Sequence, residues 1–422
     1  METILIFIVV FAILVILHEF GHYYAAKKAG ILVREFAVGF GPKLVSFRKD
    51  ETTFTIRLLP MGGYVRMAGY EEETVIRPGM PLTISLNKEE QVDMINLSSK
   101  KKIANGIPFE LISEDLEKEL YIEGNINGNP DQRKRFDVSR TALIVEEDGT
   151  EVQIAPLDRQ FQSATVLERI LTNFAGPFMN LILAIFTFTV LAFMQGGVLN
   201  NEPVIGDVLA DSPAAVSGIQ AGDRVEEING ESIEEWMDMV LYIQERPNET
   251  LDISVLKEDG STEQVEVTTK AVAVETGEEI GQIGIQASMD HSFLSKVMYG
   301  FTETWNVTKQ IVWSIVSMFT GGFSIDMFGG PVAIYATTEA VAQTGLFGII
   351  NWLAILSINL FIINLLPIPA LDGAKILLNI VEGIRGKPIS EEKEGIITLI
   401  GAGLLLLLMV AVTWNDIQRF FF

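Results

Sequence analysis

The stretch "HEFGH", from His18 to His22, holds residue types whose spacing suits metal chemistry. On a helix, His18 and His22 share one face, so both imidazoles can bind one zinc ion while Glu19 acts as general base. The stretch closes an apolar run that begins at Ile4, where polar groups are costly and mark functional sites. The pattern predicts a catalytic zinc site; the alternative is a buried histidine pair bonded to neighbouring polar groups.

A catalytic zinc takes three protein ligands and keeps one position for water. The chain has no cysteine and only one further histidine, His291, so we expect a carboxylate as the third ligand. Asp372 is the acid in "NLLPIPALDG", where two prolines end the preceding helix and let the chain turn inward. We expect Asp372 to complete the site; the alternative role is a turn or helix cap before Gly373.

These residues must be positioned by the apolar parts of the chain. A bilayer crossing takes about 20 apolar residues, and four stretches qualify: Ile4 to Ala26, Ile170 to Met194, Ile349 to Leu366 and Ile396 to Trp414. A signal peptide is the alternative for the first, but no basic residue precedes its apolar run. The third stretch runs in the same direction as the first, which brings Asp372 to about the depth of the histidines. With 48% hydrophobic residues, the chain is predicted to be a polytopic α-helical protein of the cell membrane with four transmembrane helices.

The charges predict an orientation in the bilayer. Basic residues gather after the first and third apolar stretches, whereas the segment from Gly197 to Asp290 has only four. Because basic loops stay in the cytosol, we expect both termini to be extracytoplasmic and the zinc site to lie near the cytosolic side. A net charge of −24 with no basic patch argues against nucleic acid as a partner.

The sequence divides into six parts along the chain. Residues 1–69 hold the first helix and a membrane-associated β-loop, and residues 70–165 form a cytosolic β-rich insert. The second transmembrane helix covers residues 166–196, and an extracytoplasmic α+β domain covers residues 197–290. Residues 291–348 form amphipathic helices and a loop on the outer face, and residues 349–422 form the last two transmembrane helices.

Turn residues predict local structure within these parts. "TALIVEEDGTEVQIA" predicts a hairpin around Asp148-Gly149, and "TTFTIRLLPMGGYVRMAG" predicts a strand, a turn at Pro60 to Gly63 and a shorter strand. In the outer domain we expect a short helix between Ser212 and Gly218, a helix from Ile233 to Ile243, and two strands around Asp259-Gly260. The segment "SPAAVSGIQAGDRVEEING" resembles a PDZ domain of the circularly permuted bacterial kind, which commonly binds a peptide as an added strand. The alternative is a spacer that binds nothing.

Together, H-E-x-x-H in the first apolar stretch, "FAGPFMN" in the second, the PDZ segment and "NLLPIPALDG" resemble the site-2 intramembrane metalloproteases of the bacterial RseP type. The resemblance covers nearly the whole chain. It implies that His18, His22 and Asp372 bind Zn²⁺ and that Glu19 is catalytic. It also implies that the loop containing Gly62, Gly63 and Tyr64 dips into the membrane and pairs with extended substrate. Only one PDZ domain is evident, whereas the two-PDZ members of this branch have a tandem pair, and Ala374 stands where a second glycine is usual.

The predicted activity is that of a zinc metalloendopeptidase in regulated intramembrane proteolysis. Asn364, Asn173 and Asn180 could bind substrate backbone, and helix packing is the alternative role for each. Single-span proteins such as anti-sigma factors, signal-peptide remnants and pheromone precursors fit as substrates, after an earlier cut by a site-1 protease or signal peptidase. The rival functions are a membrane zinc protease with a glutamate as third ligand and a non-enzymatic PDZ receptor. Whether the PDZ domain filters substrates by size or recruits them stays open.

Overall fold

The computed structural model describes residues 2–69, 76–103, 105–273, 279–321, 325, 329–387 and 389–421. These residues form two compact units. The first comprises Met1–Thr187 and Thr304–Phe422, and the second comprises Phe188–Glu303.

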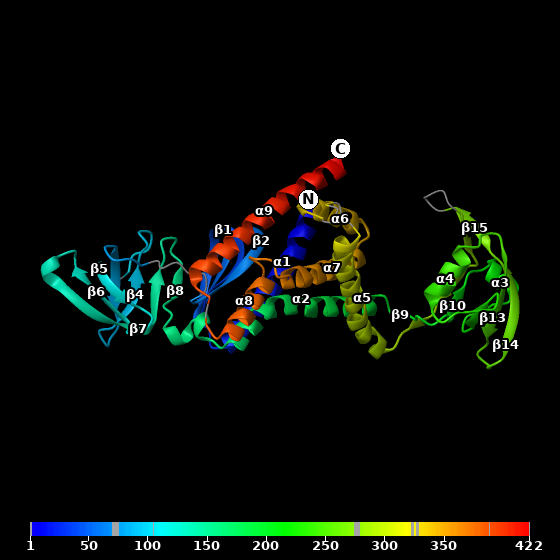
Figure 1. Ribbon diagram of the computed structural model, residues 1–422, viewed down its shortest axis with the longest axis horizontal. Coiled ribbons are helices and arrows are strands. Elements are labelled where there is room, and N and C mark those ends of the chain that lie inside the picture. Colours follow the sequence, from blue (N-terminus) through cyan, green and yellow to red (C-terminus); the bar gives the residue numbers. More distant parts are fainter. Residues whose placement is uncertain are drawn as a thin grey trace. The chain divides into compact units, whose positions relative to one another are not determined.

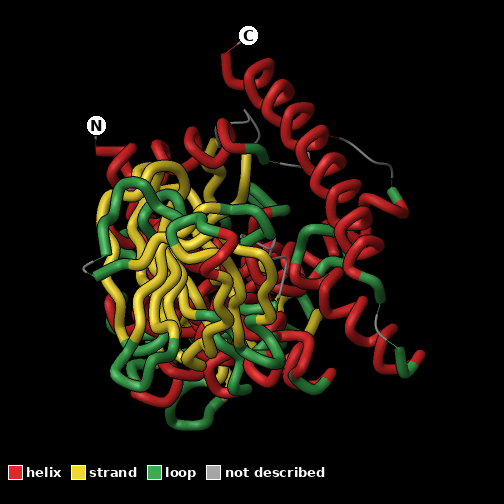
Figure 2. Tube along the Cα trace, turned by 90° about the vertical axis from the view of Figure 1, so that its left-hand side faces the viewer, coloured by secondary structure: helices red, strands yellow, loops and turns green. Residues whose placement is uncertain are grey.

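Within the described residues, four helices are long and apolar enough to cross a membrane: α1 (Glu2–Lys28), α2 (Val166–Met194), α7 (Leu346–Leu365) and α9 (Glu391–Phe421). They coincide with the four apolar stretches predicted from the sequence. In Figure 2, α9 runs as one uninterrupted helix to the C-terminal end. The first unit also contains α6 (Pro331–Gln343), α8 (Asp372–Arg385) and the part of α5 (Phe293–Thr320) from Thr304 onward.

Helices α1, α2 and α7 pack through a shared apolar core, which includes Leu14 of α1, Leu183 of α2 and Leu356 of α7. At the same level, the hydroxyl of Ser357 in α7 donates to the backbone oxygen of Asn180 in α2 at 2.7 Å. This bond satisfies a hydroxyl that is buried among apolar side chains, and it fixes α7 along α2.

Strands β1 (Val33–Lys49) and β2 (Thr52–Met67) bend so that four segments lie side by side. Phe36 pairs with Val65 on one side and with Phe54 on the other, and Phe54 also pairs with Phe47. The residues around Val65 are therefore an edge segment. The predicted reversal at residues 60–63 is confirmed: Leu59 pairs with Phe40 and Gly63 pairs back with Val38, with Gly62 at φ 89 between them, and the strand assignment of β2 continues through this bend.

The strands of residues 76–155 are β3 (Pro81–Leu86), β4 (Val92–Asn96), β5 (Ile107–Asp115), β6 (Tyr121–Ile126), β7 (Arg133–Val145) and β8 (Glu151–Gln153), and we call this part the insert. Their order is β4-β3-β5-β6-β7-β8, and an additional β4–β7 pairing closes the first five strands into a ring. Buried apolar residues such as Ile84, Ile95 and Ile122 fill it. The predicted hairpin around Asp148-Gly149 is confirmed, with Gly149 at φ 87.

The second unit combines two helices, α3 (Pro213–Ser217) and α4 (Trp236–Gln244), with short strands (Figure 1). Its four-stranded sheet has the order β12-β11-β13-β14, from Glu231–Ser232, Arg224–Ile228, Thr250–Leu256 and Thr262–Thr268. The other strands pair in twos: β10 (Ile205–Val208) with β17 (Ile285–Ala287), β15 (Lys270–Ala273) with β16 (Glu279–Gln282), and β9 (Val198–Leu199) with β18 (Met289–Asp290).

Most local predictions for this unit are confirmed. Ser212 caps α3 by accepting from the backbone N–H of Ala215 at 3.2 Å, and Gly218 ends the helix at φ 88. Helix α4 begins at Trp236, three residues later than predicted, because Glu231 and Ser232 still pair with β11. The predicted helical segment that follows His291 is one continuous helix, α5 (Phe293–Thr320).

Candidate metal centre

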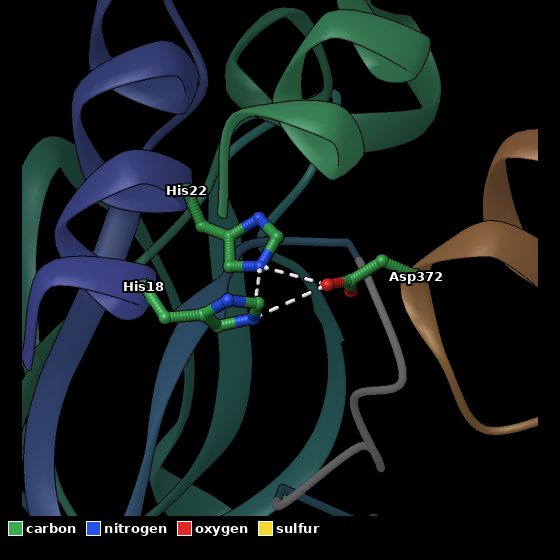
Figure 3. A group of neighbouring side chains, drawn as sticks. All are labelled: His18, His22 and Asp372. Atoms are coloured by element: carbon green, nitrogen blue, oxygen red, sulfur yellow. Dashed lines mark hydrogen bonds and ion pairs between the residues drawn. The ribbon is translucent and has the colours of Figure 1, made fainter. Parts of the chain in front are cut away.

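Three side chains from two helices point at one another (Figure 3). The Nε2 atoms of His18 and His22 lie 3.2 Å apart. The Oδ2 atom of Asp372 lies 3.2 Å from the first and 3.3 Å from the second. His22 is only 7% exposed, so this is a site inside the protein.

The spacing of these three atoms fits a zinc ion. Three ligands at about 2.0 Å from a tetrahedral zinc are about 3.3 Å from one another, which matches the observed separations. Two imidazoles and one carboxylate are also a common donor set for catalytic zinc. Oδ2 of Asp372 is buried and accepts no hydrogen bond among the described residues, as expected of an atom that binds a metal.

Hydrogen bonds orient both imidazoles. Nδ1–H of His22 donates to the backbone oxygen of Thr172 at 2.8 Å, which leaves Nε2 with a free lone pair. Nδ1 of His18 lies 3.1 Å from the side-chain amide of Asn180, whose other amide atom is buried without a partner among the described residues. When the amide is turned so that its oxygen faces His18, it accepts from Nδ1–H and leaves Nε2 for the metal.

Two glycines let α2 approach the histidines. A Cβ on Gly21 would lie 2.2 Å from the backbone oxygen of Ala175, and a Cβ on Gly176 would lie 2.2 Å from Nε2 of His22. The glycine in "HEFGH" and the one in "FAGPFMN" are thus where α1 and α2 touch. These roles were not predicted from the sequence, although a glycine before Pro177 in an apolar helix was a signal.

The start of α8 fixes Asp372. A Cβ on Gly373 would lie 2.4 Å from the backbone oxygens of Leu365 and Leu366, so only glycine lets α8 begin against the end of α7. Burial by itself would raise the pKa of Asp372, but the neighbouring imidazoles of His22 and His18 outweigh it and hold the pKa well below its usual range. The carboxylate is therefore ionised and able to bind a cation.

A buried ion pair holds α8 against α2. Arg169 donates to both carboxylate oxygens of Glu382, at 3.0 and 2.7 Å. The side chains are 8% and 17% exposed, so the pair is shielded from water. Its bidentate geometry constrains the rotation of α8 and, through it, the direction of Asp372.

The edge segment of β2 lies beside Glu19. A Cβ on Gly63 would be 3.3 Å from Cγ of Glu19 and 3.0 Å from Cγ1 of Val15. Within the described part of the chain, no strand pairs with the outer side of residues 63–67. An edge of the sheet therefore lies next to the predicted general base.

The other residues predicted to bind substrate lie in different surroundings. The hydroxyl of Tyr64 donates to Glu35 at 2.8 Å, and Gly62 lies against the ring of Phe40 at φ 89. Asn180 contacts His18, whereas Asn364 is half-buried at the end of α7. Asn173 is only 3% exposed, and its amide nitrogen has no hydrogen-bond partner among the described residues.

Comparison with known proteins defines the class. Residues 6–408 match the model of peptidase family M50. The chain is 52% identical to "Probable protease eep" of Enterococcus faecalis, with 100% of both chains covered. It is 46% identical to "Regulator of sigma-W protease RasP" of Bacillus subtilis, covering 100% of this chain and 99% of the relative. The PDZ domain of an SdrC-like protein from Listeria monocytogenes aligns to 21% of this chain and 90% of its own, at 26% identity and a TM-score of 0.18.

The chain therefore belongs to peptidase family M50. It is a multi-pass membrane protein and a zinc metalloprotease that acts in intramembrane proteolysis. The predicted family, enzyme class and cofactor are confirmed.

Proposed function

We propose that His18, His22 and Asp372 bind the catalytic zinc and that Glu19 is the general base in the cleavage of membrane-embedded peptide segments. One observation carries the proposal: ligand atoms from α1 and α8 converge within 3.3 Å of each other, and Glu19 lies one residue from His18 beside an open strand edge.

Zinc, when bound at this site, makes water more acidic and polarises the scissile carbonyl. Glu19 accepts a proton from the attacking water and delivers it to the nitrogen of the leaving amine. Asn180 and the backbone oxygen of Thr172 hold the two imidazoles in the tautomer that presents Nε2. We assign Asn180 this positioning role in preference to substrate binding.

A helical substrate must unwind before its carbonyls are accessible, because helical hydrogen bonds occupy them. The outer edge of residues 63–67 can then hold the unwound segment as an added strand, next to Glu19. Gly62 and Gly63 remain candidates for backbone bonds to this segment, and the bond from Tyr64 to Glu35 anchors the edge. Asn364 and Asn173 remain candidates for further bonds to the substrate backbone.

We propose single-span membrane proteins and signal-peptide remnants as substrates. The name of the Bacillus subtilis relative, a regulator of sigma-W, supports anti-sigma factors in particular. A site-1 protease or signal peptidase would make the earlier cut, and pheromone precursors would be processed in the same way.

We further propose the six-part organisation and the orientation predicted from the loop charges, with residues 70–165 in the cytosol and the PDZ domain of residues 197–290 outside. Because the chain has no cysteine, single cysteines report orientation cleanly. Replacements at Lys49 and Lys387 should react with an impermeant thiol reagent only after the cells are opened, whereas one at Glu258 should react in intact cells. The reverse labelling pattern would contradict the orientation.

The catalytic assignment is tested by measuring bound zinc and cleavage in parallel in detergent. Glu19→Gln should keep zinc and lose cleavage of a tagged single-span substrate, because the amide cannot accept the proton. His18→Ala should lose both. Substantial turnover by Glu19→Gln would exclude its role as general base.

A further inference from the structure

A cavity lies in the first unit, and none of the four residues of the metal centre lines it. It has a volume of about 1050 Å³ and is lined by the β-rich insert, residues 160–162, and helices α2, α8 and α9. This is slightly above the usual range for ligand-binding pockets, about 300–1,000 Å³. Among its walls are Asn379 and Glu382 of α8, the helix that begins with Asp372.

Two elements lead from the metal centre to this cavity. Along α8, Asn379 is seven residues from Asp372, or about 10 Å at 1.5 Å per residue. Strand β2 ends at Met67, and Gly69, two residues further along the chain, lines the cavity. A peptide bound along the outer edge of residues 63–67 would therefore end beside the cavity.

The cavity wall carries an acidic turn. Glu114, Asp115 and Glu117, at the end of β5, line it together with Glu394 of α9. Its basic residues are Arg34, Lys118 and Arg169, and the charge of Arg169 is already matched by Glu382. Carboxylates therefore outnumber the cations on the wall, which favours a positively charged occupant.

A polar group also points into the cavity without a partner. Asn379 is only 7% exposed, lines the cavity, and its side-chain amide makes no hydrogen bond within the described residues. An amide can donate to and accept from a peptide backbone, so it can bind an extended chain that enters here.

We propose that this cavity binds the Lys/Arg-rich cytosolic flank of the substrate's membrane segment. The inference rests on the proposed function and orientation, and it adds a specificity site to them. Single-span proteins carry basic residues where their membrane segment meets the cytosol. The acidic turn attracts those residues, Asn379 binds the backbone between them, and the scissile bond is thereby brought into register with Glu19.

The test uses the full-length protein in detergent and two reporter substrates with the same membrane segment. One has four Lys or Arg residues in its cytosolic flank, and the other has Gln at those positions. We expect the wild type to cleave the basic substrate with about tenfold higher kcat/KM, mainly through KM, as a few exposed charge pairs can supply. The triple variant Glu114→Gln, Asp115→Asn and Glu117→Gln should lose most of this preference and cleave the Gln substrate as before.

The matched control is Glu89→Gln, Glu90→Gln and Asp131→Asn, which removes the same charge from exposed parts of the insert that do not line the cavity. It should retain the preference, and Asn379→Leu should raise KM for both substrates. The inference would be overturned if the wild type showed no preference for the basic substrate. It would also be overturned if the triple variant at residues 114, 115 and 117 lost kcat/KM equally for both substrates. The proposed function is judged separately, since it requires only that the wild type cleaves the Gln substrate and Glu19→Gln does not.

Discussion

Gly176 of α2 lies directly against the imidazole of His22: a Cβ at residue 176 would be 2.2 Å from Nε2, the nitrogen that faces Asp372. Real Cβ contacts are never this short, so any side chain there must displace either the ring or the helix. The glycine therefore sets the distance between the helix that carries both histidines and its neighbour.

Gly176→Ala should weaken zinc binding by about tenfold or more, because the added methyl group overpacks the site and moves a ligand. Competition with a chelator measures the affinity. Gly403→Ala is the matched control, since a Cβ there meets nothing within 4 Å. It should leave both zinc affinity and cleavage unchanged. If the Gly176→Ala variant binds zinc with wild-type affinity, the site can accommodate the methyl group without moving a ligand.

Asn180→Leu should weaken zinc binding by about 10- to 100-fold, as loss of a hydrogen bond behind a ligand usually does. Asn180→Asp should be close to wild type, because its oxygen still accepts from Nδ1–H of His18. Orienting His18 and binding substrate, the two roles considered for Asn180, predict different results for the leucine variant. If the leucine variant keeps its zinc and only its KM rises, Asn180 binds substrate and does not orient His18.

Glu51 joins the end of α1 to the segment that leads into α2, because it accepts from Lys27 at 3.1 Å and from Arg159 at 2.9 Å. The hydrogen bond from Arg159, followed by that from Lys27, lowers the pKa of Glu51 from its ordinary value of 4.5. A lowered carboxyl pKa stabilises the fold above pH 4.5, and this contribution is lost as the pH falls through the folded-state pKa.

Glu51→Gln should therefore lower thermal stability at pH 7 by less than about 1 kcal/mol, since the cluster is partly exposed and screened by solvent. The difference from wild type should shrink as the pH falls below 4.5. Melting curves in detergent across this range measure it. A difference that stays constant with pH would show that the ion pairs contribute nothing to stability.

The domain from Val204 to Gln286 can be removed because the residues that flank it are already adjacent. Ile205 pairs with Ala287, and the backbone N–H of Ser288 donates to the oxygen of Val204 at 3.1 Å. A short Gly/Ser linker can therefore replace Val204 to Gln286. If the domain excludes bulky substrates, the deletion should permit cleavage of full-length substrates while short stubs are still cut. Slower cleavage of stubs, with full-length substrate left intact, would instead show that the domain recruits.

Much of the site could be predicted because its signals are local. The spacing of His18 and His22 on a helix, and the length of the four apolar stretches, are properties of short segments with a fixed geometry. Turn residues likewise determined the helix between Ser212 and Gly218 and the hairpin at Asp148-Gly149.

Only the tertiary structure decided which distant segments meet. Asp372 is 350 positions beyond His22, so sequence spacing could propose the contact but could not give its 3.3 Å. The bond between Asn180 and His18, the β4–β7 pairing that closes the insert, and the place of Gly63 beside Glu19 depend on how separate elements pack. Such contacts leave no periodic pattern in the chain, because they arise from the fit between surfaces and not from the repeat of a helix or strand.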